Sequence, residues 1–270
     1  MFQYFISFYL FFFGLCLGSF LNVLVDRGER GKSLRGRSKC DFCGYQLKWF
    51  DNIPVLSFFL LGGKCRKCRK KLSFQYPIVE LAMGLVFLFL GHQVFSNQIF
   101  FRTSFQQFFF LLFLVFSIFF LAAVFLWDLK YMVIPDVLIW SGLIVSILFR
   151  IFSMIFWNHN WLDKQTGLIS GFLGALATGG FFGALWFFSK GKWIGLGDVK
   201  LGLWLGMLVG VQLVYPAMMV SYILGALVAI FLLWRNKKKM SSQVPFGPFL
   251  VLGFLISFFW GSKMIEWIIQ

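Results

Sequence analysis

The sequence has 270 residues, of which 60% are hydrophobic, including 40 phenylalanines and 11 tryptophans. A soluble globular domain of this length has too little interior to bury so many large apolar side chains, so the composition excludes that class. The formal net charge is +15, which we attribute to membrane topology and to attraction toward anionic lipid headgroups. We therefore expect a polytopic membrane protein that contacts membrane lipids and has no nucleic acid partner.

Helices that cross the hydrocarbon layer need about 20 mostly apolar residues, and the chain holds eight such segments. They lie near residues 4–25, 75–91, 106–127, 133–154, 168–189, 197–213, 215–234 and 247–268. The predicted fold class is all-α, an integral membrane protein with about eight transmembrane helices. A long loop, residues 26–73, separates the first two helices.

Basic residues gather in alternate loops, and this asymmetry predicts the orientation of the chain. Residues 26–73 hold thirteen Lys and Arg against four acids, and a further basic run begins at Arg235. Short cytosolic loops retain Lys and Arg, whereas translocated loops do not. We therefore expect these loops in the cytosol and both termini on the outer side.

The long loop carries two CxxC pairs, Cys40 with Cys43 and Cys65 with Cys68. Four thiolates form a closed tetrahedral zinc site that has no open position for a substrate. Disulfides are the alternative, but thiols stay reduced in the cytosol, where the charge places this loop. The pattern predicts a structural Zn²⁺ held by all four cysteines in a zinc-ribbon-like loop.

Two further features of this region can be explained with or without chemistry. Gly63 and Lys64 precede the second cysteine pair, where a backbone amide and an ammonium can approach an anionic ligand. A plain turn that delivers Cys65 to the metal is the simpler interpretation. Glu80 suits the positive N-terminal end of the second helix, although an acid entering a membrane span also indicates function.

The third predicted helix ends in a polar turn that carries Asp128 and Asp136. Asp136 follows Pro135 where the next helix begins, so it can cap or favour that helix N-terminus. Asp128 lies at a helix C-terminus, where the macrodipole disfavours a negative charge. A salt bridge to Lys130 is the simple alternative, but residues two apart on a helix do not face each other. Asp128 is therefore a candidate functional acid.

The sixth predicted helix opens with Gly195, Gly197, Asp198 and Lys200. Glycines then recur at positions 202, 206 and 210, and small residues spaced by four let helices pack closely. This ridge predicts that Asp198 faces the interior of the bundle, where a catalytic acid belongs. A favourable charge at a helix N-terminus is the competing explanation.

Two carboxylates at the cytosolic membrane edge predict the chemistry of an aspartic protease. If Asp128 and Asp198 lie close together, they cannot both ionise easily, so the pair shares one proton. The ionised member can take a proton from an attacking water, while the protonated member hydrogen-bonds the peptide carbonyl oxygen.

Taken together in their order and spacing, these segments resemble the bacterial type IV prepilin peptidases, which are also called prepilin leader peptidase and N-methyltransferase. The matching pieces are Gly18-Ser-Phe-Leu-Asn22, the two CxxC pairs, Asp51-Asn-Ile-Pro-Val-Leu-Ser57, Gly62-Gly-Lys-Cys65, Tyr76-Pro-Ile-Val-Glu80, Asp128 with Ile134-Pro-Asp136, Gly195-Leu-Gly-Asp198 and Pro245-Phe-Gly-Pro248.

The resemblance implies that Asp128 and Asp198 are the catalytic pair of a GxGD-type aspartic peptidase in the plasma membrane. The supporting residues would be Gly195, Gly197, Lys200 and Asp136. Such enzymes cut the basic leader of prepilins and pseudopilins on the cytosolic side. They then methylate the new N-terminus with S-adenosylmethionine, for which Gly63, Lys64 and Glu80 become candidates.

We expect three parts: an N-terminal domain over 10–92 with the first two helices and the zinc loop, a peptidase domain over 105–234, and a basic loop with the last helix over 235–270. The first part would carry methyl transfer. Two alternatives remain open: a zinc-ribbon membrane adaptor without catalysis, and a peptidase without the methyltransferase activity. The oligomeric state is not predicted.

Overall fold

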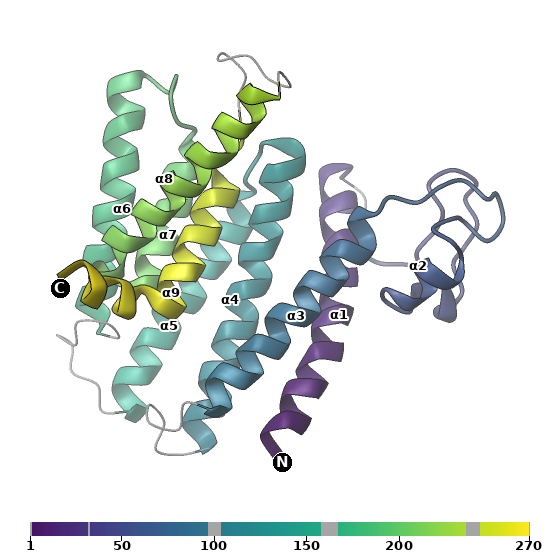
Figure 1. The fold of residues 1–270 in the computed structure, drawn as a ribbon, viewed down its shortest axis with the longest axis horizontal. Coiled ribbons are helices and arrows are strands. Elements are labelled where there is room, and N and C mark those ends of the chain that lie inside the picture. The colour runs from purple at the N-terminus through teal and green to yellow at the C-terminus, as the bar shows by residue number, and fades with distance from the viewer. Residues whose placement is uncertain (1, 32, 97–103, 158–166, 236–243, 270) are drawn as a thin grey trace. The chain divides into compact units, whose positions relative to one another are not determined.

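The computed structural model describes residues 2–31, 33–96, 104–157, 167–235 and 244–269. These ranges contain helices and connecting turns but no named strand, which confirms the all-α class. The chain divides into two compact units, residues 1–115 and 116–270 (Figure 1). The basic loop predicted after Arg235 falls largely on residues 236–243, which lie outside the described residues.

The N-terminal unit is built on two long helices, α1 (Phe2–Glu29) and α3 (Gln75–Ser96), which pack side by side (Figure 1). The packing is close because α1 presents glycines to α3. A Cβ on Gly14 would stand 2.6 Å from the Met83 carbonyl oxygen, and one on Gly18 would stand 2.7 Å from the Glu80 Cα. Small residues of this kind let helix backbones approach in a membrane, where no hydrophobic effect drives helices together.

The segment between α1 and α3 folds into a small body of turns with two short helices. These are η1 (Trp49–Asn52) and α2 (Leu56–Leu60). A buried carboxylate holds part of this body, because Asp51 accepts hydrogen bonds from the Lys48 backbone N–H and from the Arg66 side chain. The predicted long loop is therefore a folded part of the unit.

The second unit contains the end of α4 (Ser104–Tyr131) and five further helices. They are α5 (Asp136–Trp157), α6 (Leu168–Ser189), α7 (Leu196–Val209), α8 (Val211–Trp234) and α9 (Gly247–Ile269). Helix α7 contacts α5, α6, α8 and α9, so it forms the centre of this bundle. Its side chains Leu201, Trp204 and Leu205 are fully buried.

Seven helices in the described ranges are long and apolar enough to cross a membrane. The predicted segment 197–213 differs from the structure, because α7 has only 14 residues and ends at Gly210, where the backbone turns with φ of +79°. At 1.5 Å per residue, α7 is about 21 Å long, short of the roughly 30 Å hydrocarbon layer. Hydropathy alone did not reveal this break, because apolar residues continue on both sides of Gly210.

Polar side chains buried in the bundle hold α7 in place. The Arg150 guanidinium on α5 donates to the carbonyl oxygens of Met207, Leu208 and Gly167. Positive charge at a helix C-terminus offsets the macrodipole and satisfies carbonyls that lack helical partners. Thr178 on α6 donates to the Gly202 carbonyl at 2.6 Å. These bonds position the helix that carries Asp198.

Candidate active site and metal centre

Asp128 lies in the last turn of α4, and its carboxylate has a partner far away in the sequence. Its Oδ2 accepts a hydrogen bond of 2.9 Å from the backbone N–H of Gly247, the first residue of α9. The side chain is buried. The dipole argument considered only α4, whereas Asp128 also meets the positive N-terminal end of α9. Asp128 thus has a structural interaction that the sequence interpretation did not foresee.

Asp198 is the third residue of α7, whose N-cap is Gly195. The Gly195 backbone hydrogen-bonds the Asp198 carboxylate, as acids at this position commonly do when they reach back to the cap. α7 is not among the seven candidate spans. Burial raises the pKa of the Asp198 carboxyl, the nearby charge of Asp128 raises it further, and the Gly195 hydrogen bond opposes both.

The two acids are brought together by packing on Ile134, in the turn between α4 and α5. A Cβ on Gly197 would stand 3.4 Å from Ile134, and a Cβ on Gly247 would stand 3.4 Å from the same side chain. Asp128 lies within electrostatic range of Asp198, Gly247 contacts the Asp128 carboxyl, and a Cβ on Gly195 would stand 3.7 Å from Asp198 Oδ2. Each glycine leaves space that a side chain would fill.

Aromatic side chains stand beside Asp198 in the same unit. Tyr222 on α8 lies within electrostatic range of Asp198, and its ring centroid is 5.3 Å from that of Phe246. Phe246 in turn contacts Phe182 on α6, with centroids 6.1 Å apart. Asp198 thus lies near one end of an aromatic cluster formed by Tyr222, Phe246 and Phe182.

Asp136 and Lys200, both predicted as supporting residues, form an ion pair. The Lys200 Nζ stands 2.8 Å from each Asp136 carboxylate oxygen. The pair joins the first turn of α5, which contains Asp136, to the early part of α7. The Lys200 side chain is 30% exposed and the Asp136 side chain is 57% exposed, so the pair sits at the surface and adds little stability.

The four predicted metal ligands meet in the N-terminal unit. Their Sγ atoms all lie within 4.8 Å of one another, with 3.9 Å between Cys40 and Cys68 and 4.0 Å between Cys43 and Cys65. Zn–S bonds of about 2.3 Å in a tetrahedron put sulfurs about 3.8 Å apart, whereas a disulfide needs about 2.05 Å. The cluster can hold a metal ion and is not disulfide-bonded.

Both cysteine pairs form the same turn. The Cys40 N–H donates to the Tyr45 carbonyl and the Gly44 N–H donates to the Cys40 carbonyl. Cys65 makes the equivalent bonds with Lys70 and Arg69. Backbone hydrogen bonding from Cys68 is the largest influence that lowers the pKa of Cys65, to about 7. A lowered pKa favours the thiolate, which is the form that binds metals.

The three residues singled out for methyl transfer have different surroundings. Lys64 and Glu80 line a cavity of this unit, whereas Gly63 does not. The Gly63 N–H donates to the Phe58 carbonyl and its φ is +65°, so it forms the plain turn. Glu80 Oε2 accepts the Val55 N–H at 2.7 Å, and thereby joins α3 to the cysteine-bearing loop.

Two family models match separate parts of the chain. The family described as Bacterial Peptidase A24 N-terminal domain matches residues 12–94, and the Type IV leader peptidase family matches residues 114–230. A prepilin leader peptidase/N-methyltransferase from Vibrio cholerae is 30% identical over 257 residues, which cover 91% of this chain and 93% of that protein. The chain belongs to the prepilin leader peptidase/N-methyltransferase family.

Other members of the prepilin leader peptidase/N-methyltransferase family are similarly related. The protein of that name from Pseudomonas aeruginosa is 29% identical, covering 95% of this chain and 91% of its own length. The one from Pseudomonas putida is 28% identical, covering 93% and 89%. No solved structure matches the chain.

Two residues that hold the site in place do not stand out in the sequence. Gly247 is the hydrogen-bond partner of Asp128, but in the sequence it is only one member of the Pro245-Phe-Gly-Pro248 segment. Arg150 binds the carbonyls at the end of α7. Arg150 is a single basic residue inside a long apolar stretch. Because buried charges in membrane helices are rare and need partners, this pattern could have indicated a structural role for Arg150.

Proposed function

We propose that this protein cuts the leader peptide of type IV prepilins or pseudopilins with Asp128, Asp198 and a water molecule. The observation that carries the proposal is the electrostatic coupling of two acids from separate helices, α4 and α7, in one glycine-lined site. Family membership supplies the substrate class. Gly195 and Gly197 would support the site by leaving room beside the carboxyls.

The chemistry follows from sharing one proton between the two carboxyls. The ionised carboxylate takes a proton from water as the water oxygen attacks the scissile carbonyl, and the protonated carboxyl hydrogen-bonds the carbonyl oxygen. The Gly247 N–H holds Asp128 in a fixed orientation during this step. The raised pKa of Asp198 supports a proton shared by the pair at a pH where an ordinary aspartate is fully ionised.

We further propose that the cysteine cluster holds a structural Zn²⁺. Four thiols with tetrahedral spacing are a donor set that zinc favours, and a site closed by four protein ligands has no position for a substrate. The metal would shape the loop over α1 and α3. Zinc would thus serve the N-terminal domain, predicted over residues 10–92, and would take no part in leader cleavage.

The N-terminal domain would methylate the new N-terminus of the cleaved pilin, with S-adenosylmethionine as donor. The name shared by the relatives carries this part of the proposal. The peptidase domain would extend over residues 105–234, and the last part over 235–270. The positive loop, residues 26–73, supports a cytosolic site in a plasma membrane protein with both termini outside.

Two single substitutions test the peptidase. Asp128→Asn keeps an oxygen that can accept the Gly247 hydrogen bond, so it removes the charge while retaining the structural interaction. We expect Asp128→Asn and Asp198→Asn each to abolish leader cleavage at normal membrane levels. A non-catalytic adaptor is the second candidate, because Asp128 also contacts the start of α9. Retained cleavage in either variant would contradict the aspartic mechanism.

A further inference from the structure

Helix α2, in the folded segment between α1 and α3, has an exposed apolar face. Leu56, Phe59 and Leu60 occupy positions i, i+3 and i+4, so they share one side of the helix, and they are 53%, 65% and 76% exposed. Trp49 on η1, which contacts α2, is 75% exposed. We call these four residues the α2 face. Large apolar side chains gathered in this way on a surface indicate an interaction site.

Contacts with α1 and α3 place α2 beside the membrane-spanning helices and not beyond their ends. The Val55 N–H, just before α2, donates to Glu80 Oε2 on α3, and a Cβ on Gly18 of α1 would stand 2.7 Å from the Glu80 Cα. Gly18 lies eleven residues, or about 16 Å at 1.5 Å per residue, before the end of α1 at Glu29. Helix α2 therefore begins at a level that lies inside both candidate spans.

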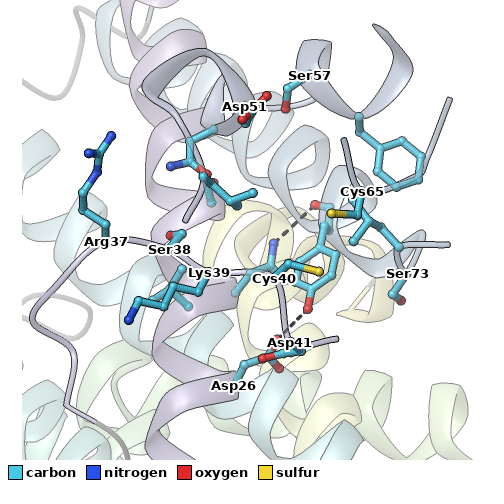
Figure 2. Close-up of a pocket in the computed structure, with 18 of the residues that line it drawn as sticks. Asp26, Arg37, Ser38, Lys39, Cys40, Asp41, Asp51, Ser57, Cys65 and Ser73 are labelled. Atoms are coloured by element: carbon cyan, nitrogen blue, oxygen red, sulfur yellow. Dashed lines mark hydrogen bonds between the residues drawn. The ribbon is translucent and has the colours of Figure 1, made fainter. Parts of the chain in front are cut away.

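The cavity of this unit, of about 1280 Å³, supports the same placement of α2 (Figure 2). Its walls include Cys16 and Phe20 of α1 together with Ser57 and Leu61 of the α2 segment. Figure 2 shows Ser57 at the opposite end of the cavity from Asp26, which lies near the end of α1. One side of α2 thus borders the cavity toward α1, while the α2 face is on the other side of the helix.

Exposed side chains on α1 and α3 indicate what surrounds the unit at this level. Phe20, two residues after Gly18, is 46% exposed, and Leu81, next to Glu80, is 43% exposed. On helices that span a bilayer, outward apolar side chains face lipid tails. The α2 face therefore lies at a level where the surroundings of its unit are lipid.

The backbone that begins α2 meets the condition for contact with lipid. Because hydrocarbon offers no water, N–H groups there need partners within the protein, and the first turn of a helix normally leaves several N–H groups without one. Here the Val55 N–H donates to Glu80 Oε2 at 2.7 Å, and the Leu56 N–H donates to the Pro54 carbonyl. The carboxylate of α3 thus supplies a partner that water would otherwise have to provide.

We propose that the α2 face inserts into the lipid leaflet on the side where α1 ends and α3 begins, and so anchors the folded loop to the membrane. Apolar side chains that include Trp and have Lys or Arg close by are typical of segments that lie in the bilayer interface. Lys48 and Lys64 flank the α2 face in the sequence, and residues 26–73 hold thirteen Lys and Arg against four acids. Anionic headgroups complement this charge. The inference does not depend on the proposed peptidase or methyl-transfer activity.

The test measures how strongly lipid quenches a fluorescent amino acid placed on the α2 face. The probe, which is excited apart from tryptophan, replaces Phe59 in the full-length protein in nanodiscs whose phospholipids carry bromine in their acyl chains. Leu81, exposed on α3 at the level of α2, is the lipid-facing reference. Phe42 is the matched control, because it is 57% exposed and its neighbour Asp41 pairs with Arg30, beyond the end of α1. We expect the loss of fluorescence at Phe59 to match that at Leu81 and to exceed that at Phe42.

Iodide in the surrounding water gives the complementary readout. It should quench the probe at Phe42 and leave the probe at Phe59 bright. A Phe59 probe that iodide quenches and brominated lipid does not would place the α2 face in water and overturn the proposal. A probe that neither quenches would be covered by protein, such as a second copy of the chain, and would overturn it as well. If the Phe59 probe lowers the midpoint of thermal unfolding, the same measurement is made with the probe at Leu60, which is more exposed.

Discussion

Substituting Gly247 with alanine should impair cleavage although both catalytic acids are retained. A Cβ on Gly247 would stand 2.5 Å from Asp128 Oδ2 and 3.2 Å from its Cγ. Ordinary van der Waals contact begins near 3.4 Å, so the carboxylate must move by about 0.9 Å, the difference between 3.4 and 2.5 Å. Misplacing a reacting group by about 1 Å can reduce the rate by 10²-fold.

We therefore expect Gly247→Ala to lower kcat/KM for leader cleavage by about 100-fold, which corresponds to about 2.7 kcal/mol of transition-state stabilisation. The assay is cleavage of a purified prepilin or pseudopilin by the detergent-solubilised enzyme. Gly180→Ala on α6 is the control, because a Cβ at Gly180 meets nothing within 4 Å.

Thermal unfolding distinguishes a misplaced carboxylate from a misfolded protein. Gly247→Ala should retain a cooperative transition, and donor binding by the N-terminal unit should be unchanged. Cleavage at the wild-type rate in a folded Gly247→Ala protein would refute the idea that this backbone contact orients Asp128.

Three further predictions concern protonation, metal and packing. The pKa of Asp198 is raised, so the proton shared by the two acids is lost only well above pH 4. Cleavage should therefore continue at pH values well above 4 and fall only when the pH rises further. A pH–rate profile that already falls near pH 4 would contradict the shared proton. Removing zinc with a chelator under reducing conditions should lower the midpoint of thermal unfolding and weaken binding of the methyl donor, while leader cleavage continues. A purified protein that contains no zinc and still unfolds at the same temperature would argue against a structural Zn²⁺. Arg150→Met leaves the carbonyls of Met207, Leu208 and Gly167 without this donor and should destabilise the bundle by about 3 kcal/mol, measured by thermal unfolding in detergent.

The sequence predicted those features that depend on residues close together in the chain. The cysteine spacing predicted a cluster because each CxxC pair forms its own turn, and Gly195 with Asp198 predicted a helix start. The contact between Asp128 and Gly247 could not be predicted in this way, since it joins residues 119 positions apart. The dipole argument for Asp128 was incomplete for the same reason: a second helix supplies the missing positive end.

Helix lengths show a similar limit. Hydropathy averages over a window, so the boundary between two predicted helices fell between residues 213 and 215, although the backbone turns at Gly210, where α7 ends and α8 begins. The role of Arg150 depended on which carbonyls lie opposite it, which only the packed bundle determines. Conversely, the glycine ridge of α7 was predictable, because Gly202 and Gly206 pack against α6 as four-residue spacing requires.

The shortness of α7 matters because this helix lies at the centre of the bundle, among α5, α6, α8 and α9. A helix about 21 Å long falls roughly 9 Å short of the hydrocarbon thickness, while its neighbours α6 and α8 have 22 and 24 residues. The ends of α7 therefore meet the surrounding helices and their connecting turns, where a lipid-facing helix would meet the bilayer. Because Asp198 lies in the first turn of α7, these neighbours, and not lipid, set how water reaches its carboxyl.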